Sequence, residues 1–565
     1  MATPAQSRAA ERIPVALAAG IALADASIVT LGLPSILVEL DATVEGVALV
    51  LGVYTAVLAI ALLPAAGLAR RYGDAHLGAA GMALFALASL GCGASDSLVL
   101  LLILRGVQAI GAAGALVAAF ELLDGSTAGM GRRMWVAASV FGIAVGPALG
   151  GALTQAFSWR AIFLAQAPLL IPGLLVALRA ARAEVVPAAE GRDPDRPSYR
   201  LPQRAAIALA LLSASLTAVI FLVVLLLVSG WSIEPLTAAL AVSVLPISAL
   251  AASRIRGDAE TRAVAGCLLV AGGVGCLALL PGASAWWTVA PQALAGAGMG
   301  MALPALSGEL MPERTRHDVS RLLSIRHAGI AIALAALAPL ISANLTTTVD
   351  EAREQGTAAV LDAPLPPENK IQIAPELFGG LDTDDPRGEL ESSIEDASAG
   401  LDSEEAAELD SLGERLDDVV TGAVRSAFRA TFLVTAALAL IAALVLLWGA
   451  LAPAGAVARP AVAAAAVAAM LAAVSYGVAF ADSERETVAI GDPCEDRELP
   501  ESDGITGEIQ QISLAALDRA ACDIGSGREE LLLALFDDRL QEEFEEEHGV
   551  NPRSPTVLGP ALLGL

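Results

Sequence analysis

Long apolar runs constrain this chain more than any other feature of its sequence. Many of them pass the length of roughly 18 apolar residues that a membrane-spanning helix needs. The chain is 56% hydrophobic and 17% charged, whereas about a quarter of the residues in an ordinary soluble domain are charged. We therefore predict an all-α membrane protein with thirteen transmembrane helices. The apolar blocks cover residues 14–38, 46–69, 77–97, 98–123, 134–156, 161–178, 204–229, 236–253, 263–282, 285–308, 324–346, 428–451 and 459–480.

The negative charge of the chain is concentrated in two segments. Residues 347–425 hold 21 acidic against 5 basic residues, and residues 481–565 hold 21 against 6. These segments carry −16 and −15 of the net charge of −27, which leaves +4 for the remainder. We predict a nearly neutral membrane body with two acidic appendages, whose solvated surfaces could also attract a cell-envelope partner.

Arginines are distributed unevenly between the predicted loops. With a cytoplasmic N-terminus, the short inner segments hold most of them, such as Arg70 and Arg179, and the short outer loops hold only Arg160. Because positive residues collect on the cytoplasmic side, we expect a multi-pass protein of the plasma (inner) membrane with an extracytoplasmic C-terminus. Both acidic segments then lie outside, where we expect Cys494 and Cys522 to form a disulfide.

Two short sequences recur at one separation. "QAIGAAG" begins at Gln108 and "QALAGAG" at Gln292, while "ARRYGD" begins at Ala69 and "SRIRGD" at Ser253, so both pairs are offset by 184 residues. The shared offset predicts two parallel six-helix repeats, as in one large class of transporters, with one extra C-terminal helix. The predicted domains are an N-terminal six-helix half (1–180), a cytoplasmic linker (181–203), helices 7–11 (204–346), an acidic extracytoplasmic insert (347–425), helix 12 (426–451), an extra helix (459–480) and an acidic extracytoplasmic tail (481–565).

Four stretches of the first half carry a resemblance to a known family. They are "LADASIVTLGLPSI" with Asp25, "LRGVQAIGAAG" with Arg105 and Gln108, "GIAVGPALGG" from residue 142, and "WRAIFLAQAP", where Gln166 replaces a usual asparagine. The chain resembles the major facilitator superfamily, and more narrowly its drug:proton antiporter branch. The resemblance implies alternating access and a bent, closely packed fifth helix that seals one side against proton leak. The residues of that helix motif are Gly142, Gly146, Pro147, Gly150 and Gly151.

The loop after the second predicted helix departs from the family pattern. The family usually reads Gly-x-Leu-Ala-Asp-Arg-x-Gly-Arg-Arg, whereas this chain has "AGLARRYGDA" from residue 66, with Arg70 at the usual aspartate and Asp74 at a usual arginine. In the family this loop makes an ion pair between the halves. Either the exchanged charges still gate the cytoplasmic side, or Arg70 is a positive-inside anchor. The candidate gate residues are Gly67, Arg70, Arg71, Gly73 and Asp74.

Asp25 is the most unusual residue of the first apolar block. An ionised carboxylate at bilayer depth costs roughly 2.5–3.5 kcal/mol on insertion scales. Asp25 therefore either couples protonation to conformation or is a structural, hydrogen-bonded group. Arg105 stays protonated, so it either favours ionised Asp25 or binds a substrate anion or backbone carbonyls. We expect the repeat-related Gln108 and Gln292 to face a substrate cavity together.

Other polar residues in the body lie close to the predicted ends of helices. Glu121 and Asp124 end the fourth helix, where solvation by cytoplasmic water is the simpler interpretation. His327, beside Arg326, is expected near the inner surface as a lipid-facing anchor, with a proton relay as the alternative.

These observations predict a secondary transporter and not an enzyme. We expect proton-coupled efflux of small amphipathic compounds, with a small-molecule substrate, protons and the lipid bilayer as partners. The alternatives are an uptake transporter, or a transporter-derived receptor or scaffold with an acidic ectodomain. No nucleotide-binding loop, catalytic triad or Cys/His metal motif occurs in the sequence, so we expect no cofactor, metal or nucleic acid.

Overall fold

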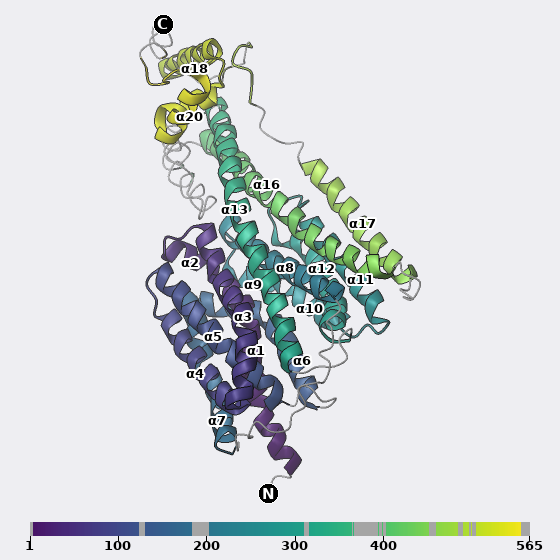
Figure 1. Cartoon of the computed structure of the whole chain (residues 1–565). Helices are drawn as coiled ribbons and strands as arrows, with labels where there is room; N and C mark the ends of the chain where they lie inside the picture. The colour runs from purple at the N-terminus through teal and green to yellow at the C-terminus, as the bar shows by residue number, and fades with distance from the viewer. Residues whose placement is uncertain are drawn as a thin grey trace. The chain divides into compact units, whose positions relative to one another are not determined.

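The computed structural model describes residues 4–123, 130–183, 203–309, 316–363, 403–450, 459–483, 490–495 and 504–554, together with residues 365, 394, 398, 499 and 557. The described elements are helices throughout (Figure 1). They form two compact units. The membrane unit comprises Met1–Val228, Ile233–Ser342 and Arg429–Phe480, and the acidic unit comprises Ser229–Ser232, Ala343–Phe428 and Ala481–Leu565.

The first half of the membrane unit contains the six predicted blocks, the first of them divided into two helices. Thr43 caps the helix of the second block by accepting a hydrogen bond from the Gly46 N–H at 3.1 Å. Gly73, with φ of +89°, separates the helix of the second block from that of the third. Positive φ is a conformation that glycine adopts without strain. The helices are α1 (Pro4–Thr30), α2 (Leu33–Glu39), α3 (Val44–Tyr72), α4 (Asp74–Gly93), α5 (Leu98–Leu122), α6 (Met130–Ala156) and α7 (Trp159–Ala183).

The second half differs from the prediction at one block. The block expected at 236–253 is two helices, because Pro246 lacks the N–H that would bond the Val242 carbonyl. The elements are α8 (Gln203–Leu225), the π-helical turn η1 (Leu226–Gly230), α9 (Pro235–Val242), α10 (Val244–Ala252), α11 (Ala259–Leu277), α12 (Ala285–Pro304), the π-helical turn η2 (Ala305–Glu309), α13 (Arg316–Asp362), α16 (Ser403–Ala450) and α17 (Arg459–Ser483).

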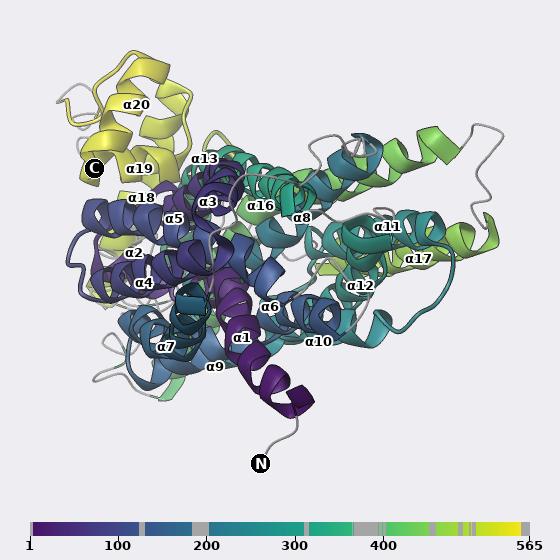
Figure 2. The same cartoon turned by 60° about the horizontal axis from the view of Figure 1, so that its bottom comes forward.

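The two halves repeat one packing device. A Cβ atom on Gly111 of α5 would lie 2.5 Å from the Phe85 nitrogen of α4, and one on Gly298 of α12 would lie 2.4 Å from the Gly266 carbonyl oxygen of α11. Helices approach this closely only where the side chain is absent. The helix pair α4–α5 therefore corresponds to α11–α12, in line with the offset seen in the sequence. Figure 2 shows the first-half helices in purple and blue and α10–α12 in teal.

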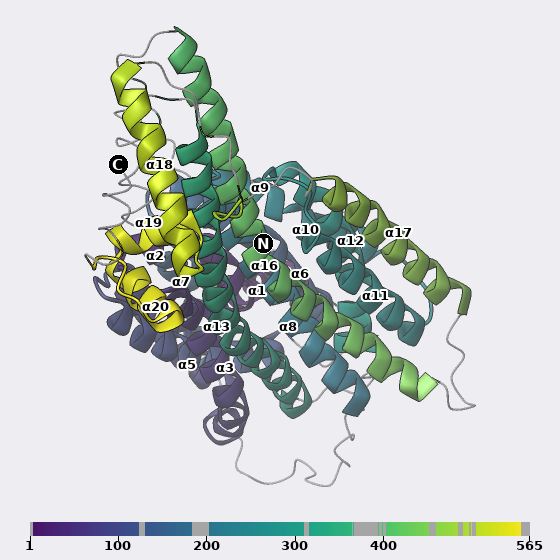
Figure 3. The ribbon, with the colours of Figure 1, turned by 90° about the horizontal axis from the view of Figure 1, so that it is seen from above.

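Twelve helices of the described chain are long and apolar enough to cross a membrane. They include the extra C-terminal helix, whose candidate span is Pro460–Ala481. Helix α6 is not among the twelve, and 11 of its 27 side chains lie outside the described residues, so the count of thirteen spans stays a prediction. Helix α17 lies beside α11 and α12 (Figure 3), and the Tyr476 hydroxyl donates a hydrogen bond to the Trp287 carbonyl at 2.7 Å.

The acidic unit combines residues from both acidic segments. The ends of α13 and α16 pack through a core that includes Val360, Leu412 and Leu416. Helices α18 (Gly504–Ile524), α19 (Arg528–Phe536) and α20 (Asp538–His548) share a second core. Arg353 Nη2 bonds Asp537 Oδ2 at 2.9 Å. The segments expected as two separate appendages therefore fold together, because oppositely charged side chains join them.

Two further links involve the tail: one joins it to the insert and the other joins two of its own segments. Arg528, whose side chain is fully buried, bonds Asp362 through Nη2 at 2.8 Å. Cys494 and Cys522 are joined by a disulfide, with their Cα atoms 5.1 Å apart. The disulfide ties the segment before α18 to α18 itself.

Candidate functional site

Asp25 lies inside the first half of the membrane unit and forms an ion pair with Arg105. The Asp25 carboxylate Oδ2 and the Arg105 Nη1 are 2.6 Å apart, and both side chains are 0% exposed. Asp25 comes from α1 and Arg105 from α5. Two opposite charges buried together compensate each other, whereas one alone would be strongly destabilising.

Three neutral polar side chains surround this ion pair. Gln166 of α7 donates through Nε2 to Asp25 Oδ1 at 2.9 Å. Gln108 accepts from Arg105 Nη1 at 2.6 Å, and its Nε2 donates to Gln166 Oε1 at 2.9 Å and to Ser89 Oγ at 2.8 Å. We call Asp25, Arg105, Gln108, Gln166 and Ser89 the buried network. It ties together α1, α4, α5 and α7.

Tyr54 of α3 holds the arginine from another side. The Arg105 guanidinium carbon lies 4.3 Å from the centre of the Tyr54 ring, and Arg105 Nε donates to the Val50 carbonyl at 3.1 Å. The Tyr54 hydroxyl donates to the Ala22 carbonyl of α1 at 2.8 Å. Tyr54 was not expected from the sequence, where a polar ring within an apolar block was its one available signal.

One carboxylate oxygen of the network accepts no hydrogen bond. Among the described residues, neither Asp25 Oδ2 nor Arg105 Nη2 has a hydrogen-bond partner. Arg105 Nη1 directs its hydrogen bond at Gln108 instead. Oδ2 is therefore held by charge alone, and it is the atom at which a proton can add without displacing a hydrogen bond.

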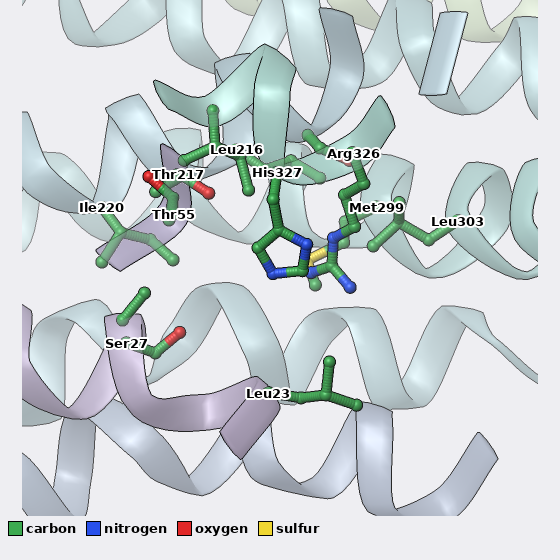
Figure 4. A pocket seen from close by; sticks show the side chains of 13 residues that line it. Leu23, Ser27, Thr55, Leu216, Thr217, Ile220, Met299, Leu303, Arg326 and His327 are labelled. Carbon is green, nitrogen blue, oxygen red and sulfur yellow. The ribbon is translucent and has the colours of Figure 1, made fainter. Parts of the chain in front are cut away.

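A small cavity is lined by residues of both halves of the membrane unit, and we call it the central cavity (Figure 4). It encloses about 40 Å³, room for roughly three waters at about 10–15 Å³ each. Helix α1 presents Leu23 and Ser27 to the cavity and Asp25 to the buried network. Helix α3 likewise presents Thr55 to the cavity and Tyr54 to the network. The same two helices thus border both. The lining residues are Leu23, Ala26, Ser27, Thr55, Ser213, Leu216, Thr217, Ile220, Met299, Leu303, Arg326, His327 and Ile330.

The expected place of Arg326 and His327 at the inner surface is wrong. Helix α13 begins at Arg316, so these residues lie ten or more residues along it, about 15 Å at 1.5 Å per residue. Both line the central cavity (Figure 4). His327 is 5% exposed, and its Nδ1 donates to the Leu323 carbonyl at 2.8 Å. The helix starts in the polar stretch before the apolar block, which hid its true beginning.

Gln108 and Gln292 do not come together. Gln108 is occupied in the buried network, and Gln292 of α12 donates to Thr288 Oγ1 at 2.9 Å. Neither lines the cavity of Figure 4. Buried amides need hydrogen-bond partners, and each glutamine finds its partners within its own half.

The fifth-helix motif lies on α6 and makes close contacts with two neighbouring helices. A Cβ on Gly150 would lie 2.2 Å from the Ile28 carbonyl oxygen of α1, and one on Gly146 would lie 2.8 Å from Ser27 Cβ. On Gly151 it would lie 2.3 Å from Ala239 Cβ of α9. Helix α6 is therefore closely packed against α1 of its own half and α9 of the other. Pro147 and Gly142 lie within the same helix.

The loop between α3 and α4 contributes its acid to an ion pair between the halves. Asp74 Oδ2 accepts from Arg316 Nη2 of α13 at 2.7 Å, and Glu121 Oε1 lies 3.5 Å from Arg316 Nε. Arg70 and Arg71 are exposed, and nothing lies within 4 Å of a Cβ built on Gly67. Asp74, the first residue of α4, thus pairs with Arg316 of the second half. Asp124 lies outside the described residues.

Twelve helices long and apolar enough to span a membrane, among the described residues, and a buried ion pair within the first of two repeated halves define a multi-pass α-helical membrane protein. The model of the Major Facilitator Superfamily matches residues 15–336. The chain belongs to this superfamily.

Several curated relatives are named for drug resistance. The multidrug resistance protein Stp of Mycobacterium tuberculosis (strain CDC 1551) is 32% identical over 150 residues, 26% of this chain and 28% of Stp. The methylenomycin A resistance protein of Streptomyces coelicolor is 32% identical over 171 residues, 29% of this chain and 36% of the relative. The drug efflux pump JefA of M. tuberculosis is 31% identical over 150 residues, 26% and 30% of the two chains. The matches thus span about a third of these relatives.

The fold is similar to that of a solved transporter. The crystal structure of a bacterial homologue of the human lysosomal transporter Spinster, inward-facing and occupied, matches with a TM-score of 0.53 at 17% identity. The match covers 80% of this chain and 100% of that chain.

Proposed function

We propose that this protein is a proton-coupled exporter of small amphipathic compounds that works by alternating access in the plasma membrane. One observation carries the proposal. A fully buried aspartate, paired with a fully buried arginine, lies on the helix that also lines the central cavity. Acids within membrane segments mark proton and substrate pathways.

Protonation of Asp25 is the proposed coupling step. The ionised carboxylate attracts Arg105 across 2.6 Å. A proton on Oδ2 removes this attraction, while Arg105 keeps Gln108, the Val50 carbonyl and the Tyr54 ring. The two protonation states therefore hold α1 against α5 with different strength. A proton can shift a conformational equilibrium only through such a difference.

The close packing of α6 offers a route from α1 to the other half. Gly146 and Gly150 meet α1 beside Ser27, a cavity residue, and Gly151 meets α9. Packed helices move as bodies because side chains fill the interior densely. A displacement of α1 would therefore move α6 against α9.

The Asp74–Arg316 ion pair is the proposed cytoplasmic gate. It joins α4 of the first half to α13 of the second, and Glu121 adds a second carboxylate at 3.5 Å. The pair must open before substrate enters from the cytoplasm. The names of Stp, JefA and the methylenomycin A resistance protein support export.

The test uses purified protein in proteoliposomes with a trapped pH-sensitive dye and a panel of anionic, neutral and cationic amphipaths. We expect the wild type to concentrate at least one compound under an imposed pH gradient. Asp25→Asn should retain downhill exchange alone, since it cannot cycle a proton. Asp96→Asn, a change at an exposed loop acid, is the matched control. An Asp25→Asn protein that still concentrates substrate in response to pH would show that the acid is structural.

A further inference from the structure

The central cavity contains a cation for which the described residues supply no counter-ion. Of the 13 residues that line it, Arg326 and His327 have ionisable side chains. The other lining residues carry hydroxyl groups or apolar side chains. The ionisable groups that face the cavity are therefore both basic.

Arg326, which is half-buried, differs from the fully buried Arg105 of the same region. Arg105 has the Asp25 carboxylate, the Gln108 oxygen and the Val50 carbonyl. Arg326 Nε is buried without a hydrogen-bond partner in the described part of the chain, and no described carboxylate forms an ion pair with it. Guanidinium stays protonated, so Arg326 carries an uncompensated charge in this conformation. A charge held partly out of water without a counter-ion is costly.

Asp25 is not available as the missing counter-ion. Its two oxygens are taken by Arg105 and Gln166. Its helix presents Leu23 and Ser27 to the cavity, on the opposite side from the buried network. The compensating anion must therefore come from outside the described protein residues.

The remaining lining sets the shape of that anion. Leu216, Ile220, Met299 and Leu303 are apolar residues of the cavity lining, and Met299 and Leu303 lie on the side of Arg326 (Figure 4). The Ser213 hydroxyl in the same wall is also buried without a hydrogen-bond partner in the described residues. A ligand that satisfies this site in a wider conformation of the cavity has an anionic group for Arg326, an apolar body for the walls, and a polar atom for the serine.

We propose that Arg326 binds the anionic group of the transported compound, so that the substrates are amphipathic acids, such as carboxylates on an apolar body, and not lipophilic cations. This proposal rests on the proposed transport function. In this proposal Arg326 binds the charged group of the substrate, and the Asp25–Arg105 pair handles the coupled proton.

Equilibrium binding without any gradient tests the proposal. The probes are naphthaleneacetate, its neutral amide and naphthylethylammonium, dialysed against the full chain in lipid nanodiscs. We expect the wild type to bind naphthaleneacetate at least about tenfold more tightly than the ammonium probe. Arg326→Gln should lose about tenfold or more for naphthaleneacetate and leave the amide within about twofold. Arg326→Lys should recover most of the loss. Arg256→Gln, at an exposed arginine, is the matched control.

Two outcomes would overturn the proposal: a wild type that binds the acid no better than the ammonium probe, or an Arg326→Gln protein with unchanged affinity for the acid. Thermal unfolding supplies a second measurement. Without ligand, the Arg326→Gln protein should unfold at the wild-type temperature or above it, since it loses an uncompensated charge. A clearly lower unfolding temperature would show that Arg326 has a structural role. Binding without pH-driven transport would refute the proposed function alone. Transport of amines with no acid binding would refute this inference alone.

Discussion

At the scale of single residues, the Asp25–Arg105 pair is a matched set of two costly charges. Arg105→Gln leaves the buried carboxylate without its cation, which destabilises a protein by about 3–5 kcal/mol. The double variant Asp25→Asn/Arg105→Gln removes both charges, so we expect it to recover most of that loss. Thermal unfolding in detergent measures the free energies of all four proteins. If the double variant lost the sum of the stabilities lost by the two single variants, the two side chains, 2.6 Å apart, would not depend on each other.

The sequence revealed the charged members of the buried network more readily than the neutral ones. Asp25 and Arg105 stand out because ionised groups are rare in apolar blocks. Tyr54 and Ser89 do not, since hydroxyl groups are common in membrane helices and their partners lie on other helices. Arg326 was misplaced because a helix that begins in a polar stretch leaves no apolar signal at its start.

At the scale of elements, helix α6 is held between two neighbours with no spare volume. Gly150→Ala would place a methyl carbon 2.2 Å from the Ile28 carbonyl oxygen, so α6 and α1 must separate. We expect a loss of about 1–3 kcal/mol of stability together with loss of transport. The control is Gly52→Ala in α3, where nothing lies within 4 Å of the added carbon. Equal transport by the two variants would contradict the role of this contact.

The sequence predicted most of the helices and their repeat, because length and apolar composition largely determine a membrane helix. It did not predict the division between α9 and α10. Proline causes this division, but proline also occurs inside continuous helices such as α7, which contains Pro168 and Pro172. Glycine spacing indicated that the fifth predicted helix packs closely, but it did not indicate which helices lie against it.

At the scale of the whole molecule, the acidic unit has an acid-sensitive link. Burial alone would raise the pKa of Asp537, but hydrogen bonds from Arg353 and from the Leu540 and Arg539 N–H groups outweigh it and lower the pKa below its ordinary value. The stabilisation is therefore complete above the unfolded value of about 4 and is lost as the pH falls through the lower, folded value.

Hydrogen exchange of the α20 amides in the full chain measures this effect. After correction for intrinsic exchange, we expect protection to be high at neutral pH and to fall below about pH 4. In Asp537→Asn these amides should have low protection both at neutral pH and below about pH 4. Asp538→Asn, whose side chain is 90% exposed, should behave as the wild type. Acid sensitivity that persists in Asp537→Asn would place the titrating group elsewhere.

The joining of the insert and the tail was beyond the reach of sequence patterns. Both segments are acidic, so their net charges suggest repulsion. A few arginines, Arg353 and Arg528 among them, reverse this locally by pairing with acids of the other segment. If α16 and α17 both span a bilayer, the two segments that they separate emerge on the same side of it, as their pairing requires. Both helices are candidate spans by their length and apolar composition.

This joining also sets an order of events during synthesis. Asp537 is made 184 residues after its partner Arg353, a delay of about 10–40 s at roughly 5–20 residues per second. Throughout that interval the insert waits without its tail, while α16 and α17 enter the membrane. A ribosome that stalls late therefore releases a protein whose membrane helices are all inserted and whose acidic unit is still half built. Quality control of this transporter would have to recognise that unfinished surface.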